Sequence, residues 1–139
     1  MTKSNRPAPE PDLRALLAEV GPTDRSVITP NQQRAEYVSF VEMFRGQEPP
    51  FAGSVVDEVI RIGPDEHSVP VRRYRPSDEA SPGDVLIYFH GGGWVLGSPD
   101  THDRFTRAIA DRLRLHVISV DYRLAPEHPF PAAFEDCEG

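Results

Sequence analysis

The chain has 139 residues, with 15 basic and 22 acidic side chains, and its formal net charge is −7 at pH 7. This acidic balance argues against a nucleic-acid partner, because phosphate contacts need clustered lysine and arginine. The lone cysteine, Cys137, excludes an internal disulfide framework and a cysteine-rich zinc site. The N-terminus lacks the apolar core of a signal peptide, and no apolar run approaches ~18 residues, so we expect a cytoplasmic protein without a membrane span.

The N-terminal third of the chain predicts an arm followed by two short helices. Prolines among polar residues over 1–11 indicate disorder, and leucines at helical spacing over 13–20 predict the first helix. The second helix has three start signals: a capping hydroxyl at Thr29, a first-turn proline at Pro30 and a capping-box partner at Gln32. We expect this helix to end at Gly46. Its apolar face is predicted to comprise Tyr37, Phe40, Val41 and Phe44.

Two half-exposed strands are predicted next, over 55–62 and 69–74, because β-formers alternate there with charged residues. Gly63, Pro64 and Asp65 between them are typical of a turn. The pair therefore predicts an antiparallel hairpin.

A strand, helix and strand follow over residues 85–120. The continuous apolar run 85–89 predicts a strand that is buried on both faces. A helix is predicted near 101–114 and a second buried strand over 117–120, which together form a βαβ unit with a right-handed crossover. The segment from Pro131 predicts a further helix. The apolar side of the helix near 101–114 is predicted to hold Phe105, Ala108, Ile109 and Leu113.

A run of three glycines, Gly91, Gly92 and Gly93, follows the first buried strand, between His90 and Trp94. Consecutive glycines cost conformational entropy, so a folded protein keeps them mainly where bare backbone is needed. At the end of a strand, bare backbone offers N–H donors to a developing negative charge. In isolation the run would equally fit a loop that only needs positive φ angles.

Two motifs in order favour a functional interpretation of the glycine run: HGGGW at 90–94 and DYRLAPEHPFPA at 121–132. With them the sequence resembles the α/β-hydrolase fold, in particular the hormone-sensitive lipase-like esterases, from about Val55 onward. The resemblance implies an α/β fold in which an antiparallel hairpin and a βαβ unit form the N-terminal part of the hydrolase sheet. It divides the chain into a disordered arm with cap-like helices over 1–50 and an incomplete α/β-hydrolase domain over 51–139.

The resemblance also assigns roles to the residues of both motifs. The N–H groups of Gly92 and Gly93 are implied to form the oxyanion hole, and His90 and Gly91 to support that loop. Trp94 is implied to line the entrance of the substrate site. A buried polar brace behind the loop is implied for Asp121, Tyr122, Arg123 and Glu127.

The nucleophile of this fold stands in a G-x-S-x-G elbow, and no serine of the chain has that context. The family places the elbow, the acid and the base downstream of the second motif. We therefore expect the complete protein to be a serine carboxylesterase acting on short or medium acyl esters, and the chain alone to lack the triad and be inactive. We expect no cofactor and no metal site. Four histidines are expected on the surface or in loops instead of acting as bases: His67, His102, His116 and His128.

Two other functions remain open from the residues alone. The first is a nucleotide-binding βαβ unit, since Gly91, Gly93 and Gly97 follow a strand and Asp121 ends the next one. The bulky Trp94 and a helix that starts after the glycines count against it. The second is a non-catalytic truncated relic or a partner of another hydrolase.

The resemblance implies a strand order with the hairpin outermost, then the 117–121 strand, then the 85–89 strand. The most apolar strand would then form an open edge. It contains neither proline nor lysine to prevent pairing. We therefore expect self-association through 85–89.

Overall fold

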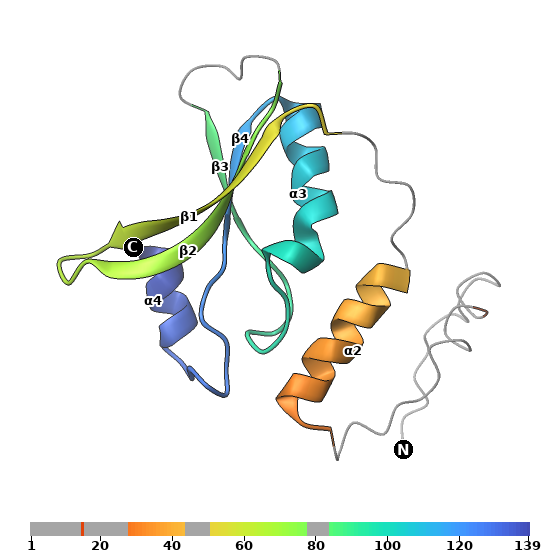
Figure 1. The fold of residues 1–139 in the computed structure, drawn as a ribbon. Coiled ribbons are helices and arrows are strands. Elements are labelled where there is room, and N and C mark those ends of the chain that lie inside the picture. The colour runs from red at the N-terminus through yellow and green to blue at the C-terminus, as the bar shows by residue number, and fades with distance from the viewer. Residues whose placement is uncertain (1–14, 16–27, 44–50, 78–83) are drawn as a thin grey trace, which may run out of the picture.

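The computed structural model describes residues 15, 28–43, 51–77 and 84–139. The predicted arm and the first predicted helix, Ala15 excepted, lie outside these ranges, as do Phe44 and Gly46. No described helix is long and apolar enough to cross a bilayer. The elements in chain order are α2 (Pro30–Met43), β1 (Ser54–Ile62), β2 (His67–Arg75), β3 (Val85–Phe89), α3 (Pro99–Leu113), β4 (His116–Val120) and α4 (Ala132–Glu138) (Figure 1).

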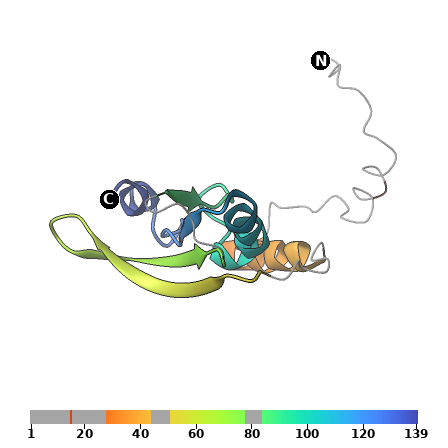
Figure 2. The same cartoon turned by 90° about the horizontal axis from the view of Figure 1, so that it is seen from above.

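The four strands form one mixed sheet in the order β1-β2-β4-β3. β2 pairs antiparallel with β1 and with β4, whereas β3 and β4 are parallel and connected through α3. The predicted hairpin, βαβ unit and strand order are therefore confirmed. Seen from above, the long β1–β2 hairpin curves away to one side and α2 lies at the opposite end of the molecule (Figure 2).

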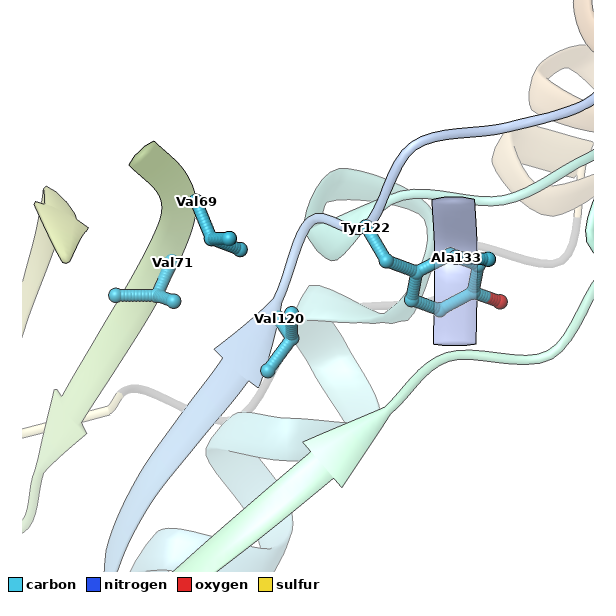
Figure 3. Packing of buried hydrophobic residues seen from close by; sticks show 5 residues of the cluster. All are labelled: Val69, Val71, Val120, Tyr122 and Ala133. Atoms are coloured by element: carbon cyan, nitrogen blue, oxygen red, sulfur yellow. The ribbon is translucent and has the colours of Figure 1, made fainter. Parts of the chain in front are cut away.

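The side chains of β2 and β4 alternate between two hydrophobic clusters, one on each face of the sheet. Val71 of β2 and Val120 of β4 are paired and belong to the cluster that includes Ala133 of α4. Tyr74 and Val117, a pair on the other face, pack with Ala110 of α3 instead. The two helices therefore cover opposite faces. In Figure 3 the side chain of Val69 points toward Val120, and the ring of Tyr122 lies beside Ala133, a residue of the same cluster.

β3 is covered on only one face, so the prediction that it is buried on both faces was wrong. Leu86 and Tyr88 pack in the α3 cluster, whereas Val85, Ile87 and Phe89 are exposed. The reason is the position of α4, which packs against the β1–β2 hairpin and Val120 instead of reaching β3.

The buried face of α3 also differs from the predicted one. Phe105 and Leu113 are exposed, and the buried helix residues after the first position are Asp103, Thr106 and Ala110. Asp103 tolerates burial because it accepts a hydrogen bond from the Tyr74 hydroxyl at 2.9 Å and pairs with Arg107. Apolar spacing alone could not reveal these polar partners.

The start of α2 agrees with its predicted signals. The Thr29 hydroxyl accepts from the Gln32 N–H at 3.3 Å, and the Gln32 side chain accepts from the Thr29 N–H at 2.8 Å, which is a reciprocal capping box. The predicted apolar face is poorly covered: Tyr37 and Val41 are half-buried and Phe40 is exposed.

Candidate active site

The loop 90–97 joins β3 to α3 and adopts a left-handed turn. Gly93 and Trp94 both have φ of 61°, and Gly92 has φ of 138°. A side chain at Gly92 would collide with the Leu96 carbonyl oxygen. The turn closes on Gly92, whose carbonyl accepts from the N–H groups of Val95 at 3.2 Å and Leu96 at 2.9 Å. This backbone path explains why glycine is needed at 92.

Several carbonyl groups of the loop are held, and from different directions. The His90 carbonyl accepts from the Tyr122 hydroxyl at 2.6 Å, and the Trp94 carbonyl accepts from the Ala125 N–H at 2.8 Å. The Val95 carbonyl accepts from Nε of Arg34 at 2.9 Å. With the turn bonds to Gly92, these contacts fix both sides of the glycine run.

The N–H groups of Gly92 and Gly93, in contrast, have no hydrogen-bond acceptor in the part of the chain that the structure describes. Gly92 is half-buried and Gly93 exposed, and a Cβ at Gly93 would meet no atom within 4 Å. The loop therefore presents two open donors, with open space at Gly93.

His90 is buried under this loop. Its Nδ1 lies 3.0 Å from the Gly91 carbonyl, so Nδ1 carries the proton and donates. The imidazole stacks on the Tyr122 ring with centroids 4.2 Å apart and planes 10° apart. Burial lowers the pKa of His90, which keeps the ring neutral. Its Nε2 is buried and has no partner among the described residues.

The predicted buried brace is only partly buried. Tyr122 is buried, and burial raises its pKa to about 12, so its hydroxyl stays protonated and donates to the loop. Asp121 and Glu127 are exposed and Arg123 is half-buried, which corrects the prediction for these three. The Glu127 carboxylate pairs with a residue of α2 while its side chain stays 48% exposed, and the half-buried Arg123 pairs with the buried Asp136 carboxylate.

Two histidines expected on the surface or in loops lie in regular elements and contact other groups. His102 is on α3, with its ring centroid 5.7 Å from that of His90, and burial lowers its pKa. His67 begins β2 and lies 2.8 Å from the buried Asp136 carboxylate. Within the described ranges, no group of three histidine, cysteine, aspartate or glutamate side chains could hold a metal ion.

The contact that the sequence did not reveal is made by Arg34. This residue of α2 donates to the Val95 carbonyl and pairs with Glu127 at 2.6 Å. Its partners lie 61 and 93 residues further along the chain, so no local pattern could have indicated them.

Comparison with known proteins supports the α/β-hydrolase interpretation of this loop. Residues 86–138, which contain both motifs, match a protein family described as alpha/beta hydrolase fold. The fold of the chain is therefore that of an α/β hydrolase, and residues 86–138 are similar to this family. α3 begins at Pro99, after the last glycine of the loop, with Ser98 as its cap.

Several curated proteins that this chain resembles are named as esterases. The chain is 53% identical over 68 residues to the carboxylesterase NlhH of Mycobacterium tuberculosis, a match that covers 49% of this chain and 21% of NlhH. It is 42% identical over 78 residues to an arylesterase of Saccharolobus solfataricus, covering 56% of this chain and 25% of that protein.

A solved structure with the same arrangement is the hyperthermophilic esterase of Pyrobaculum calidifontis. The match has a TM-score of 0.78 and 37% identity, and it covers 91% of this chain and 40% of that one. The chain thus spans about two fifths of the solved esterase and a smaller share of the curated relatives.

Proposed function

We propose that the protein is a serine carboxylesterase of small ester substrates, in which this chain supplies the oxyanion hole. The N–H groups of Gly92 and Gly93 would bind the oxygen of the tetrahedral intermediate, and His90 and Gly91 would support the loop. The observation that carries the proposal is the asymmetry of the loop: the carbonyl groups from His90 to Gly92 and those of Trp94 and Val95 are bonded, whereas the N–H groups of Gly92 and Gly93 are open.

This asymmetry is what an oxyanion hole requires. Donors that are fixed before the reaction need no reorganisation when negative charge develops on the substrate oxygen. Tyr122, Ala125 and Arg34 hold the carbonyl side, so the loop cannot rotate its peptide groups to satisfy its own donors. The neutral His90 ring adds support without adding charge to the site.

The proposal is tested by removing one N–H without changing the backbone path. D-proline at position 93 prefers a φ near +65°, the mirror image of the value for L-proline, and therefore fits the φ of 61° observed there. D-alanine at 93 keeps both the φ and the N–H, and is the matched control. We expect the D-proline form of the longest protein that the gene encodes to lose about 10²–10³ in kcat on p-nitrophenyl butyrate relative to the D-alanine form. Equal kcat values would overturn the role of Gly93.

We also propose that residues 1–139 alone do not hydrolyse esters. Loss of the triad in a serine hydrolase can cost about 10⁶ in kcat, and no serine here stands in the elbow motif. Purified chain should show no turnover that a serine-directed phosphonate blocks stoichiometrically. Such turnover would reveal a nucleophile in another context.

A non-catalytic relic or partner protein is the alternative that the same experiments address. If the longest encoded protein contains no G-x-S-x-G elbow and reacts with no phosphonate, the glycine loop serves structure alone. The domain division follows the same proposal: residues 1–50 as the cap-like part, and 51–139 as the part of the hydrolase domain that carries the loop.

We further propose that the chain associates with a second copy of itself through β3. The strand forms one edge of the sheet in the described residues, and its residues Val85, Ile87 and Phe89 are exposed. An edge strand without charge or proline is a template for pairing with another chain.

A further inference from the structure

Arg34 lies on α2, and its guanidinium contacts two separate segments at once. Nε donates to the Val95 carbonyl at 2.9 Å, and Nη2 donates to the Ala125 carbonyl, also at 2.9 Å. Nη1 and Nη2 also donate to the two carboxylate oxygens of Glu127, at 2.9 and 2.6 Å. One side chain therefore joins the helix, the glycine loop and the second motif.

These contacts close a ring around the glycine loop. Ala125 accepts from Arg34 through its carbonyl and donates through its N–H to the Trp94 carbonyl at 2.8 Å. Trp94 and Val95 are the residues directly after the glycine run, so both are tied to the same guanidinium, one directly and one through Ala125. Any shift of Arg34 is passed to the peptide groups next to Gly93.

The arrangement depends on arginine chemistry. A guanidinium is planar and presents N–H groups in fixed directions, which lets it bind a carboxylate with one edge and carbonyl oxygens with the remaining donors. Only about a quarter of the Arg34 side chain is exposed, at 26%. The pair with Arg34 lowers the pKa of Glu127 to about 2, so the carboxylate is ionised throughout the neutral range.

The contacts of α2 with the site do not end at Arg34. One turn further along the helix, the ring of Tyr37 lies 6.5 Å from that of His102, which in turn is next to His90. No residue of α2 is fully buried, so apolar packing holds this helix only weakly. Arg34 is consequently its main described attachment to the loop.

We propose that Arg34 is a positioning residue that couples the docking of α2 to the geometry of the oxyanion loop. With α2 in place, the guanidinium fixes the carbonyl groups of Val95 and Ala125 and thereby the direction of the Gly92 and Gly93 N–H groups. When α2 moves away, the loop loses this restraint. This proposal rests on the proposed function for its catalytic consequence, but the coupling itself is a property of the fold.

The first test measures amide hydrogen exchange at Val95 and Leu96, whose N–H groups close the turn on Gly92. In the longest encoded protein, Arg34→Met should raise exchange at these two amides about ten-fold or more, because charge-assisted hydrogen bonds to the loop are lost. Arg61→Met is the matched control. Arg61 is also paired with a glutamate at 2.6 Å, but this pair lies at the hairpin turn. Unchanged exchange at Val95 and Leu96 in Arg34→Met would overturn the coupling.

Two milder variants keep the test decisive if Arg34→Met folds poorly. Glu127→Gln leaves the guanidinium in place but removes the charge that orients it. Arg34→Lys keeps the charge pair with Glu127, yet a single ammonium cannot reproduce the fork toward both carbonyl groups. We expect Arg34→Lys to recover thermal stability while exchange at Val95 stays fast. A lysine variant with wild-type exchange would show that charge alone suffices and would contradict the positioning role.

The catalytic consequence is read separately, as a split between kcat and KM. Misplaced oxyanion donors should lower kcat about ten-fold in Arg34→Lys and leave KM nearly unchanged, since the donors act on the transition state. An unchanged kcat with fast exchange would limit the coupling to the fold and overturn its catalytic part. If the wild-type protein hydrolyses no ester, the proposed function fails, and the exchange experiment still decides whether Arg34 positions the loop.

Discussion

The two edges of the sheet are built in opposite ways. β1, at one edge, carries charged residues that pair with the neighbouring hairpin strand or the turn: Asp57 with Arg72 at 2.6 Å and Glu58 with Arg73 at 2.9 Å. β3, at the other edge, contains no charged residue, and its Ile87 is 58% exposed. Charge on an edge strand discourages pairing with other chains, and an apolar edge invites it.

The comparison shows which surfaces the chain covers by itself. The hairpin edge is protected by ion pairs within the sheet and by α4, which packs on the hairpin. The loop with the open glycine donors leaves from the apolar edge strand, so the uncovered surface and the candidate oxyanion hole are neighbours in sequence and in space. A partner that covered the exposed Val85, Ile87 and Phe89 of β3 would therefore also lie close to the glycine loop.

The largest effect should follow from placing a charge on the apolar edge. Ile87→Lys introduces an ammonium group at the centre of β3 and should lower the associated fraction of the chain about ten-fold in analytical ultracentrifugation. Val59→Lys is the matched control, because Val59 is equally β-branched and is 64% exposed on the protected edge. The same mass distribution for Ile87→Lys and wild type would contradict self-association through β3.

The next effect is on stability and comes from Tyr122, which supports the glycine loop that follows β3. Tyr122→Phe removes the hydroxyl that donates to the buried His90 carbonyl at 2.6 Å, and the free energy of unfolding should fall by about 1–3 kcal/mol. Tyr88→Phe is the control, since no hydrogen bond of the Tyr88 hydroxyl is found among the described residues. Chemical denaturation measures both. Equal stabilities of the two variants would show that the Tyr122 hydroxyl does not hold the loop.

The smallest effect is expected at acidic pH, in the stability that Asp136 of α4 contributes beside the β1–β2 hairpin. Burial alone would raise the pKa of Asp136, but hydrogen bonds from Arg123 and His67 outweigh burial and hold this pKa below its ordinary value. The stability that this carboxylate contributes is therefore present above the unfolded value of about 3.9 and is lost as the pH falls through the folded value. Asp136→Asn should make the unfolding free energy less dependent on pH below pH ~4. A variant that keeps the wild-type pH slope would place the acid-sensitive group elsewhere.

Short-range patterns made much of the fold predictable. The hairpin, the βαβ unit and the capping box at Thr29 each depend on residues close in sequence, so their signals are complete within a few positions. The position of the candidate site was predictable for the same reason, because the glycines of 91–93 directly follow the apolar run of β3. The family resemblance then supplied roles that local patterns could not.

The errors came from contacts between distant segments. Asp103 is buried because Tyr74 and Arg107 satisfy its carboxylate, and apolar spacing wrongly favoured Phe105 and Leu113 on the buried face. β3 was expected to be covered on both faces, but this depends on where α4 packs. No local sequence pattern marks Arg34, because its contact with the Val95 carbonyl forms only when α2 packs against the loop.

The most direct measurement of the central claim is a through-hydrogen-bond coupling between amide nitrogen and phosphorus. The longest encoded protein is labelled with ¹⁵N and reacted with a serine-directed phosphonate, whose phosphoryl oxygen occupies the place of the substrate oxyanion. We predict an adduct in which the Gly92 and Gly93 nitrogens both couple to phosphorus and their amide protons shift downfield, while the Val95 and Leu96 amides stay bonded to Gly92. An adduct without coupling at these two glycines, or no adduct at all, would contradict the account.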